Sequence, residues 1–298
     1  MLTWRPVRGA IGWLDAPAPH SPAGDFCLSV AIRTIVLGAE QAGRRSATLG
    51  VGNGIVMDSD AAEEFAETQT KTRYLRAMDP GFTLFETMRV SHGRVRNLRQ
   101  HLQRLRASAA ALGFDFDEAA VQAALCTQLG TLNTKQSYRL RLDLQHNGSV
   151  GVQTSALDPL PPGPALLLLA TAPVPAAEAA LLKHKTSLRS TYDAAIRAAI
   201  SHQAFDTIFQ NAQGAVTEGA RSSLLVKIDG RWWTPPLRSG VLAGVMRQRL
   251  LQRFPQIGER VLRLDEVMAA QQLVVCSALR GLQHAQWLRG PDGELLRV

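Results

Sequence analysis

One stretch of the chain is apolar at almost every position: PALLLLATAP, residues 164–173. This run is far shorter than the ~20 residues that a membrane-spanning helix needs. A short, near-continuous apolar run is instead typical of a β-strand that is covered on both faces. Because other elements must provide that cover, the run predicts a sheet enclosed in a large fold. The 298 residues, 46% of them hydrophobic, suffice for one large domain or two.

A basic cluster follows this strand. Lys183, His184 and Lys185 precede a Ser/Thr run, and the pattern TYDAAIRAAISHQ then predicts an amphipathic helix over residues 191–203. Positive charge is favoured at the C-terminal end of a helix, whereas these residues lie before its start. Two interpretations remain: an exposed loop, or a segment after the buried strand that holds one lysine for chemistry.

The positive charge of the chain is concentrated in its second part. The formal net charge is +8, but residues 1–72 carry 6 Lys/Arg and 8 Asp/Glu, a net of −2, whereas the remainder carries 27 and 17, a net of +10. These basic residues are spread along helical patterns, and aromatic residues make up only 6% of the chain. A nucleic-acid-binding surface usually gathers basic and stacking residues together, so the distribution favours a small anionic ligand.

The three cysteines, Cys27, Cys126 and Cys276, are widely spaced and form no CxxC pair. They indicate neither a disulfide framework nor a zinc site, and we expect reduced thiols. The N-terminal sequence MLTWRPVRGAIGW has no signal-peptide pattern. Since no apolar run is long enough for a membrane span, we expect a cytoplasmic protein with no membrane partner.

The first part of the chain is rich in Gly, Pro and short β-like runs. The sequence DFCLSVAIRTIVL predicts a strand over residues 25–37. Farther on, Asp58, Ser59 and Asp60 are suited to cap a helix whose first turns are acidic, as the helix dipole favours. Taken alone, these residues indicate a turn followed by a solvent-exposed helix.

The second part begins near Pro80 with two hairpins and a helix. Residues 81–98 predict two strands joined at the turn SHG, and residues 138–157 predict a further hairpin. Between them, helical spacing relates Leu98, Leu102, Leu105 and Ala109. In the second hairpin, alternation places Tyr138, Leu140, Leu142 and Leu144 on one face and Arg139, Arg141 and Asp143 on the other.

Residues 205–254 predict a strand, a glycine turn, another strand and then a hairpin at Asp229 and Gly230. A glycine loop over residues 240–244 opens the next helix. Such a loop can cradle a phosphate, because free N–H groups and the helix dipole converge there. From the residues alone, Glu218 could equally be a carboxylate in a surface turn, and Arg104 could equally be an exposed arginine on a helix.

The motifs AIGWLD, SVAIRT, VGNGIVMDSD and EEFAETQTK resemble the C-terminal end of the chorismate-utilising domain of aminodeoxychorismate synthase component I. The resemblance implies that Arg33 and the backbone of residues 52–54 hold chorismate carboxylates, that Glu64 is a magnesium ligand, and that Lys71 lies near the substrate.

This resemblance covers only about residues 1–75, and the upstream half of such a domain is missing. Ala61 also stands where the family usually has Pro. We therefore expect a truncated, partial chorismate-binding-type α+β segment that does not process chorismate and has no functional metal site, with Glu64 as a vestigial ligand. A partial sheet leaves unpaired edges and exposed core, so this segment is expected to be the less stable one.

A second set of motifs occurs in the order and spacing of the class IV pyridoxal-phosphate enzymes: FETMRV, HLQRLRASA, HKTSLRSTYD, AVTEGARSSLLV, TPPLRSGVLAGVMR and CSALRG. Residues 81–298 resemble this family, and most of all its 4-amino-4-deoxychorismate lyases. The resemblance implies fold type IV, an α+β / α/β architecture. It has a small α/β domain at about residues 81–172 and a larger β-rich domain at about residues 173–298.

The resemblance also implies roles for individual residues around a pyridoxal 5′-phosphate cofactor. Lys185 matches the lysine that forms the Schiff base, with Lys183 as the competing candidate, and Glu218 matches the carboxylate that keeps the pyridine nitrogen protonated. The positions that match phosphate ligands are Arg104, Ser222, Val245, Met246 and Ser277. Tyr192 is expected near the cofactor's phenolic oxygen. Ser223 stands where the family usually has Asn, so the resemblance does not decide which contact Ser222 and Ser223 make with the cofactor.

The expected reaction converts aminodeoxychorismate to p-aminobenzoate and pyruvate in folate biosynthesis. Arg139, Arg141 and Arg189 are candidates to hold substrate carboxylates, with surface solvation as the alternative for each. Branched-chain and D-amino acid aminotransferases share most of these motifs, so amino transfer is the alternative reaction. A degenerate protein that only binds a synthase is a third. Class IV enzymes resemble one another in forming homodimers, so we expect one here, with a synthase or glutamine amidotransferase as a further partner.

Overall fold

The computed structural model describes residues 10–14, 26–30, 35–41, 44–51, 53, 56–71, 81–179 and 181–298. The chain divides into two compact units, Met1–Met78 and Asp79–Val298. Arg33, Gly52 and Gly54, for which roles in chorismate binding are expected, lie outside the described residues. None of the helices in the described ranges is long and apolar enough to cross a membrane.

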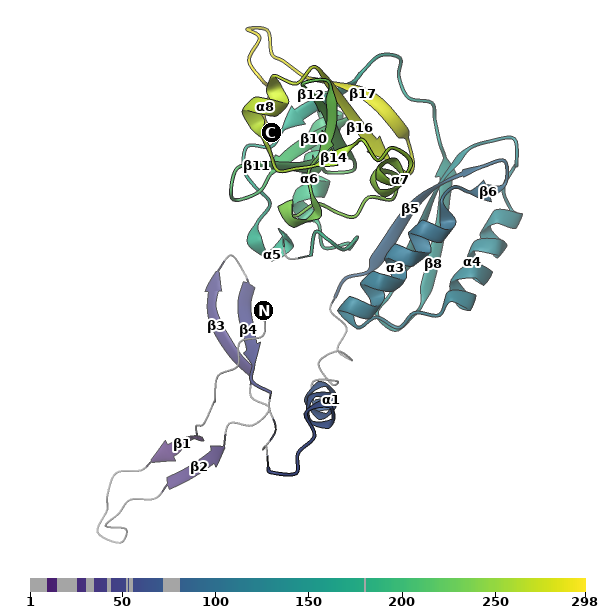
Figure 1. The fold of residues 1–298 in the computed structure, drawn as a ribbon. Helices are drawn as coiled ribbons and strands as arrows, with labels where there is room; N and C mark the ends of the chain where they lie inside the picture. The colour runs from purple at the N-terminus through teal and green to yellow at the C-terminus, as the bar shows by residue number, and fades with distance from the viewer. Residues whose placement is uncertain are drawn as a thin grey trace. The chain divides into compact units, whose positions relative to one another are not determined.

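The described residues of the first unit form two separate two-stranded sheets and one helix (Figure 1). Strand β1 (Ala10–Leu14) pairs antiparallel with β2 (Phe26–Val30), and β3 (Ile35–Gln41) pairs antiparallel with β4 (Arg44–Leu49). The expected single strand over residues 25–37 is therefore wrong, because its two ends belong to different sheets.

Helix α1 (Ala61–Lys71) begins where the sequence predicts it. The Asp60 carboxylate accepts hydrogen bonds from the backbone N–H groups of Ala62 at 2.9 Å and Glu63 at 3.0 Å, which confirms the predicted N-cap. Apolar side chains such as Val36 and Phe65 are 64% and 51% exposed. This exposure is typical of a unit with little core of its own.

The second unit has a small part built on a four-stranded antiparallel sheet in the order β6-β5-β7-β8. Its elements are β5 (Leu84–Ser91), β6 (Arg94–Val95), α3 (Leu98–Leu112), α4 (Glu118–Gly130), β7 (Tyr138–Leu144) and β8 (Val150–Ala156). Both helices cover one face of the sheet (Figure 1). The predicted hairpins and helix are confirmed.

Alternation in the strands of this sheet creates two unlike faces. Leu84, Met88 and Leu140 are fully buried and pack with Leu105 of α3 in one core. The residues between them face the other way, and they include Phe85 and Thr87 on β5 and Arg139 and Arg141 on β7. This second face carries charged and polar groups and takes part in the site described below.

The large part is a mixed nine-stranded sheet in the order β14-β13-β12-β16-β17-β9-β10-β11-β15. Its strands are β9 (Ala165–Leu169), β10 (Asp206–Gln210), β11 (Ala215–Gly219), β12 (Ser223–Ile228), β13 (Arg231–Thr234), β14 (Gly258–Glu259), β15 (Leu262–Arg263), β16 (Gln272–Ser277) and β17 (Gly281–Trp287). Its helices are α5 (Ala176–Ala179), α6 (Ser190–Ser201), η1 (Leu237–Ser239), α7 (Val245–Arg253) and α8 (Leu264–Met268).

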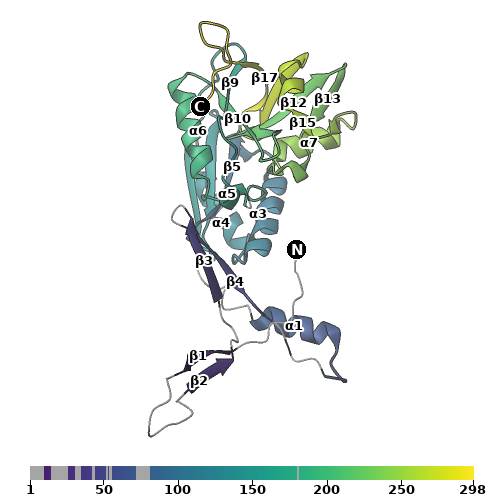
Figure 2. The ribbon, with the colours of Figure 1, turned by 90° about the vertical axis from the view of Figure 1, so that its left-hand side faces the viewer.

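Strand β9 lies between β17 and β10 and is parallel to both. Leu167, Leu168 and Leu169 are all 0% exposed, and Leu168 packs with Ala199. Ala199 belongs to α6, the helix that runs alongside the large sheet in Figure 2. The predicted strand with two covered faces is confirmed. Because β9 belongs to the large sheet, the boundary expected near residue 172 is wrong, and the two parts meet between β8 and β9.

Candidate active site

A cavity of about 840 Å³ lies between the open face of the small sheet and one end of the large sheet. Strands β5 and β7 contribute one wall. The segment before α6, the turn between β11 and β12, the start of α7 and the turn after β16 contribute the rest. Of the side chains that the sequence singled out, Lys185 and Glu218 both line this cavity.

Lys185 is placed by backbone pairing with the small part. The N–H of Phe85 donates to the Lys185 carbonyl at 2.9 Å, and Thr186 forms an isolated antiparallel bridge with Leu84. The Lys185 amine lies 4.6 Å from the centre of the Phe85 ring. Lys183, in contrast, is exposed and does not line the cavity. The segment after the buried strand therefore delivers Lys185, not Lys183, to the cavity.

The electrostatic environment favours the neutral amine of Lys185. Burial, followed by the positive charges of Arg189 and Arg104, lowers the pKa of Lys185 to about 7, against the opposing effect of the Glu86 and Glu218 carboxylates. An amine with such a pKa is partly neutral near pH 7. Lys185 can thus act there as a nucleophile or as a base.

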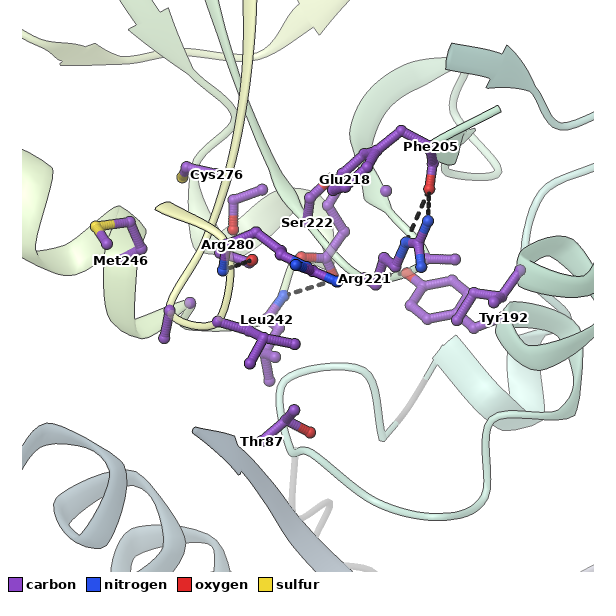
Figure 3. Close-up of a pocket in the computed structure, with 18 of the residues that line it drawn as sticks. Thr87, Tyr192, Phe205, Glu218, Arg221, Ser222, Leu242, Met246, Cys276 and Arg280 are labelled. Carbon is purple, nitrogen blue, oxygen red and sulfur yellow. Dashed lines mark hydrogen bonds between the residues drawn. The ribbon is translucent and has the colours of Figure 1, made fainter. Parts of the chain in front are cut away.

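Glu218 lies near the end of β11, with its side chain buried. Its Oε1 atom accepts hydrogen bonds from the backbone N–H of Leu242 at 2.9 Å and from the Tyr192 hydroxyl at 3.4 Å (Figure 3). Burial raises the pKa of Glu218 to about 7, although the Leu242 hydrogen bond and the charge of Lys185 oppose this. Burial and the Glu218 charge also raise the pKa of Tyr192. Tyr192 is thus a partner of Glu218.

The start of α7 forms a cradle for an anion. Gly244 precedes the helix, so the first N–H groups of α7, from Val245 onward, have no partner within the helix. A Cβ on Gly244 would lie 2.6 Å from the Ser223 hydroxyl, which shows how closely this serine approaches the loop. Met246 also lines the cavity here. Helix dipole and N–H groups converge on this point, as in phosphate sites.

Arg104 reaches the same loop from the small part. Its Nη1 atom donates to the Ala243 carbonyl at 3.1 Å, while Nε and Nη2 donate to the Glu86 carboxylate at 2.8 and 2.5 Å. Glu86 also lies 2.7 Å from Nδ1 of His101. Burial alone would raise the pKa of Glu86, but Arg104 and His101 hold it at about 2. A buried carboxylate, which sequence reasoning missed, thus fixes the predicted arginine beside the cradle.

The two serines after Glu218 point to different places. Ser222 donates to the buried carboxylate of Asp206 at 2.5 Å, whereas Ser223 approaches Gly244. The Ser222 hydroxyl proton is therefore used within the protein, and Ser223 is the serine that lies beside the loop before α7. The sequence contained one indication that these two serines differ from the family pattern, since Ser223 stands at the position where the family usually has Asn. Ser277 accepts a hydrogen bond from the Arg280 N–H at 3.1 Å and lines the cavity.

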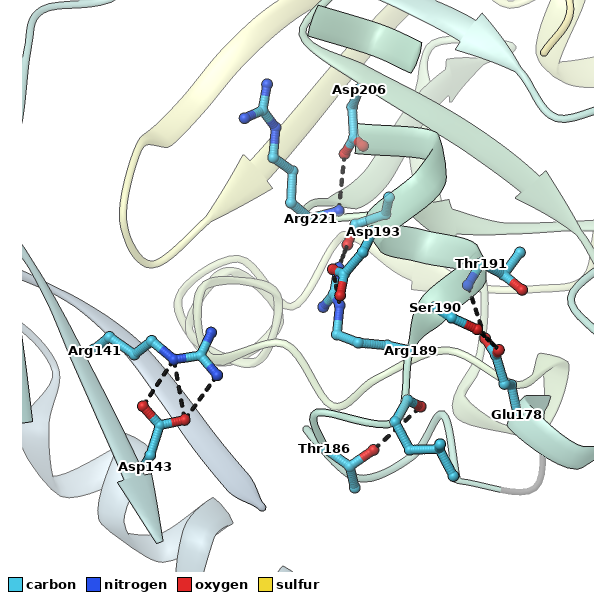
Figure 4. A network of polar contacts seen from close by, with 12 residues as sticks. Arg141, Asp143, Glu178, Thr186, Arg189, Ser190, Thr191, Asp193, Asp206 and Arg221 are labelled. Atoms are coloured by element: carbon cyan, nitrogen blue, oxygen red, sulfur yellow. Dashed lines mark hydrogen bonds and ion pairs between the residues drawn. The ribbon is translucent and has the colours of Figure 1, made fainter. Parts of the chain in front are cut away.

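The three arginines proposed for substrate carboxylates all line the cavity, but two of them are paired within the protein (Figure 4). Arg141 forms a forked ion pair with Asp143, its shortest contact being 2.7 Å. Arg189 lies 2.9 Å from Asp193 and donates to the Ala220 carbonyl at 2.6 Å. Arg139 is exposed.

Glu64 in the first unit belongs to a hydrogen-bond network. Its carboxylate accepts from the Ser59 hydroxyl at 2.7 Å, and its carbonyl accepts from Asn53 at 2.7 Å. The Ser59 and Asn53 hydrogen bonds lower the pKa of Glu64. Lys71 donates to the Asn53 side chain at 2.5 Å. Within the described ranges, no three His, Cys, Asp or Glu side chains gather as a metal site would require.

Comparison with known proteins relates the chain to two families. Residues 83–286 match the family model described as amino-transferase class IV, and residues 8–77 match that of the chorismate binding enzymes. A "Putative aminodeoxychorismate lyase" of Schizosaccharomyces pombe is 29% identical over 202 residues, which cover 66% of this chain and 86% of that protein.

Solved structures share the fold of the second unit. The crystal structure of a "Putative amino-acid aminotransferase" from Mesorhizobium loti matches with a TM-score of 0.64 and 33% identity, covering 69% of this chain and 99% of that one. The pyridoxal-phosphate-bound form of a hypothetical aminotransferase from Mycobacterium tuberculosis matches with a TM-score of 0.58 and 24% identity, covering 72% of this chain and 84% of that one. The chain therefore belongs to the class IV aminotransferase family, whose fold type IV enzymes use pyridoxal 5′-phosphate.

Proposed function

We propose that the chain converts 4-amino-4-deoxychorismate to p-aminobenzoate and pyruvate with pyridoxal 5′-phosphate as cofactor. The observation that carries the proposal is the combination of matches: a chorismate-binding segment at residues 8–77 and a class IV segment at residues 83–286 in one chain. Synthesis and cleavage of aminodeoxychorismate are consecutive steps. The relative in Schizosaccharomyces pombe, described as a lyase of this compound, supports the same assignment.

The residues of the cavity fit this cofactor. The cradle of Gly244, Ser223 and the first N–H groups of α7 suits its phosphate, with Arg104 and Ser277 beside it. Glu218 would hold a proton at the pyridine nitrogen, and its raised pKa suits a carboxyl that shares a proton. Lys185 would carry the cofactor covalently. When bound, the protonated ring withdraws electrons from the carbon that bears the substrate amine.

Lys185 is the residue that moves the proton. Its amine, which is partly neutral near pH 7, takes the proton from the ring carbon that bears the substrate amine. The electron pair of that C–H bond forms a new double bond in the substrate ring as the neighbouring carbon–oxygen bond of the substrate breaks. The enolpyruvyl group leaves with the electrons of this bond, takes up a proton at its methylene carbon and becomes pyruvate, while the ring becomes aromatic. Atoms and electrons balance without an oxidant.

Amino transfer is the second candidate, favoured by the 33% identity to the Mesorhizobium loti aminotransferase. The first proton removal by Lys185 is the same in both reactions, and they differ in whether the proton returns to the cofactor. A catalytically degenerate partner of a synthase fits less well, because Lys185, Glu218 and Arg104 are all present and line the cavity. We further propose a cytoplasmic homodimer whose residues 1–75 are dispensable for the chemical step.

The test supplies the purified, cofactor-loaded chain with aminodeoxychorismate in one assay. A second assay supplies branched-chain or D-amino acids together with 2-oxoglutarate. The proposal expects p-aminobenzoate and pyruvate in equal amounts in the first assay and little turnover in the second. Amino transfer at normal enzymatic rates without p-aminobenzoate would replace the lyase with the aminotransferase. A chain lacking residues 1–75 should keep the lyase rate per folded molecule.

A further inference from the structure

Three further arginines that the sequence did not single out line the cavity, and one of them, Arg247, is paired with Glu259. Arg221 lies in the turn between β11 and β12, and Arg280 lies in the turn after β16 (Figure 3). Arg141 and Arg189 each form an ion pair with a carboxylate. In the part of the chain that the structure describes, neither Arg221 nor Arg280 belongs to an ion pair.

Backbone carbonyls hold both guanidinium groups in place. Arg221 donates through Nε and Nη2 to the Phe205 carbonyl and stacks at 4.6 Å over the Phe205 ring. Arg280 donates through Nη1 to the Asp158 carbonyl at 2.5 Å. A neutral carbonyl fixes a guanidinium without cancelling its charge, and each fork keeps further N–H donors. The two groups are therefore held in place while their charge stays available.

The charges of these arginines act on one another. The pKa of Arg280 is lowered first by burial and then by the positive charge of Arg221, with a smaller contribution from Arg89, while Asp158 acts in the opposite direction. Like charges brought together at a partly buried position repel unless an anion joins them. Such an arrangement costs stability in the empty cavity and favours a ligand with a carboxylate there.

The chemistry of the proposed substrate indicates which carboxylate this is. The amine of aminodeoxychorismate must reach Lys185, and the ring carboxylate lies across the six-membered ring from that amine. Arg221 is exposed and Arg280 is half-buried, so this pair lies toward the solvent side of the cavity. The other carboxylate departs with pyruvate, whereas the ring carboxylate remains in p-aminobenzoate.

We propose that Arg280, with the charge of Arg221 beside it, binds the ring carboxylate of the substrate and of the p-aminobenzoate product. This inference rests on the proposed function and adds two residues to its substrate site. The backbone N–H of Arg280 also donates to the hydroxyl of Ser277, another residue that lines the cavity, at 3.1 Å. The turn after β16 would thus carry both Arg280, which binds the end of the substrate distant from Lys185, and Ser277, which faces the cofactor.

The test compares Arg280→Gln with wild type in the cofactor-loaded, full-length chain. We expect the KM for aminodeoxychorismate to rise at least tenfold with kcat within about twofold, because the lost contact is the same before and during the reaction. The inhibition constant of p-aminobenzoate should rise by a similar factor. That of aniline, which lacks the carboxylate, should not change. Arg280→Lys should recover part of the loss.

Arg231→Gln is the matched control, since it removes the same charge from β13, outside the residues that line the cavity. The inference is overturned if the KM for aminodeoxychorismate and the inhibition constant of p-aminobenzoate both stay within about twofold of wild type in Arg280→Gln. It is also overturned if Arg280→Gln loses the cofactor's visible absorbance, because Arg280 would then act through the Ser277 turn.

Binding of p-aminobenzoate by calorimetry separates this inference from the proposed reaction. If the chain shows no lyase turnover but p-aminobenzoate binding still depends on Arg280, the reaction is wrong and the carboxylate site stands. If lyase turnover is present and Arg280→Gln binds p-aminobenzoate as wild type does, the reaction stands and the carboxylate site is wrong.

Discussion

Replacing Glu86 with Gln tests the support beneath Arg104. The Glu86 side chain is 1% exposed and holds both the Arg104 fork and His101. Its pKa falls from an ordinary value of 4.5 to about 2. A lowering of this size corresponds to about 3 kcal/mol of stability at neutral pH, since each tenfold change in an ionisation constant is worth about 1.4 kcal/mol. Removing one partner of a buried ion pair typically costs about 3–5 kcal/mol, which agrees.

The assay is hydrogen exchange of the peptides that cover β5 and α3, which reports the opening free energy of the small part. Glu118→Gln is the control, because its ion pair with Arg106 is largely exposed and should contribute about 1 kcal/mol or less. Since the folded-state pKa of Glu86 is depressed, its stabilisation is complete above about pH 4.5 and is lost as the pH falls toward 2. A loss below about 1 kcal/mol at pH 7 in Glu86→Gln would refute the reasoning.

Two further substitutions test other parts of the site. Gly219→Ala should destabilise the turn after Glu218 by about 1–3 kcal/mol or more, because the new Cβ would overlap the Asp206 carboxylate. The control Gly130→Ala has open space around the new Cβ and should be neutral or stabilising. Hydrogen exchange around each position measures both effects. In the cofactor-free protein, the raised pKa of Glu218 makes the folded state bind an extra proton, so stability declines as the pH rises from about 4.5 to 7. Glu218→Gln should remove this decline. Thermal unfolding that shows the same decline in the variant would contradict this.

Local patterns in the sequence suffice to predict much of the second unit. Asp229 and Gly230 both adopt positive φ, at 50° and 74°, as a two-residue hairpin turn requires. Alternation in β7 correctly separates Leu140 and Leu142 from Arg139 and Arg141. These features depend on neighbours in the chain, so a short window of sequence contains the information.

Long-range partners have no such local signature. The bridge between Thr186 and Leu84 places Lys185, yet about a hundred residues separate its two sides in the chain. Ser222 matches a phosphate-binding position, but its hydroxyl donates a hydrogen bond to the buried carboxylate of Asp206. The pairs of Arg141 with Asp143 and of Arg189 with Asp193 are local by contrast, because strand alternation and helical spacing already bring these side chains together. The contact of Arg280 with the Asp158 carbonyl joins residues that are 122 positions apart, so only the fold reveals it.

The assignment of Lys185 as the residue that carries the cofactor can be tested directly by labelling. The cofactor-loaded chain is reduced with borohydride, digested, and its peptides are weighed by mass spectrometry. The account predicts a pyridoxyl group on Lys185, none on Lys183, wild-type absorbance in Lys183→Ala, and loss of both label and visible absorbance in Lys185→Ala. A label on Lys183, or a fully labelled and coloured Lys185→Ala variant, would contradict it.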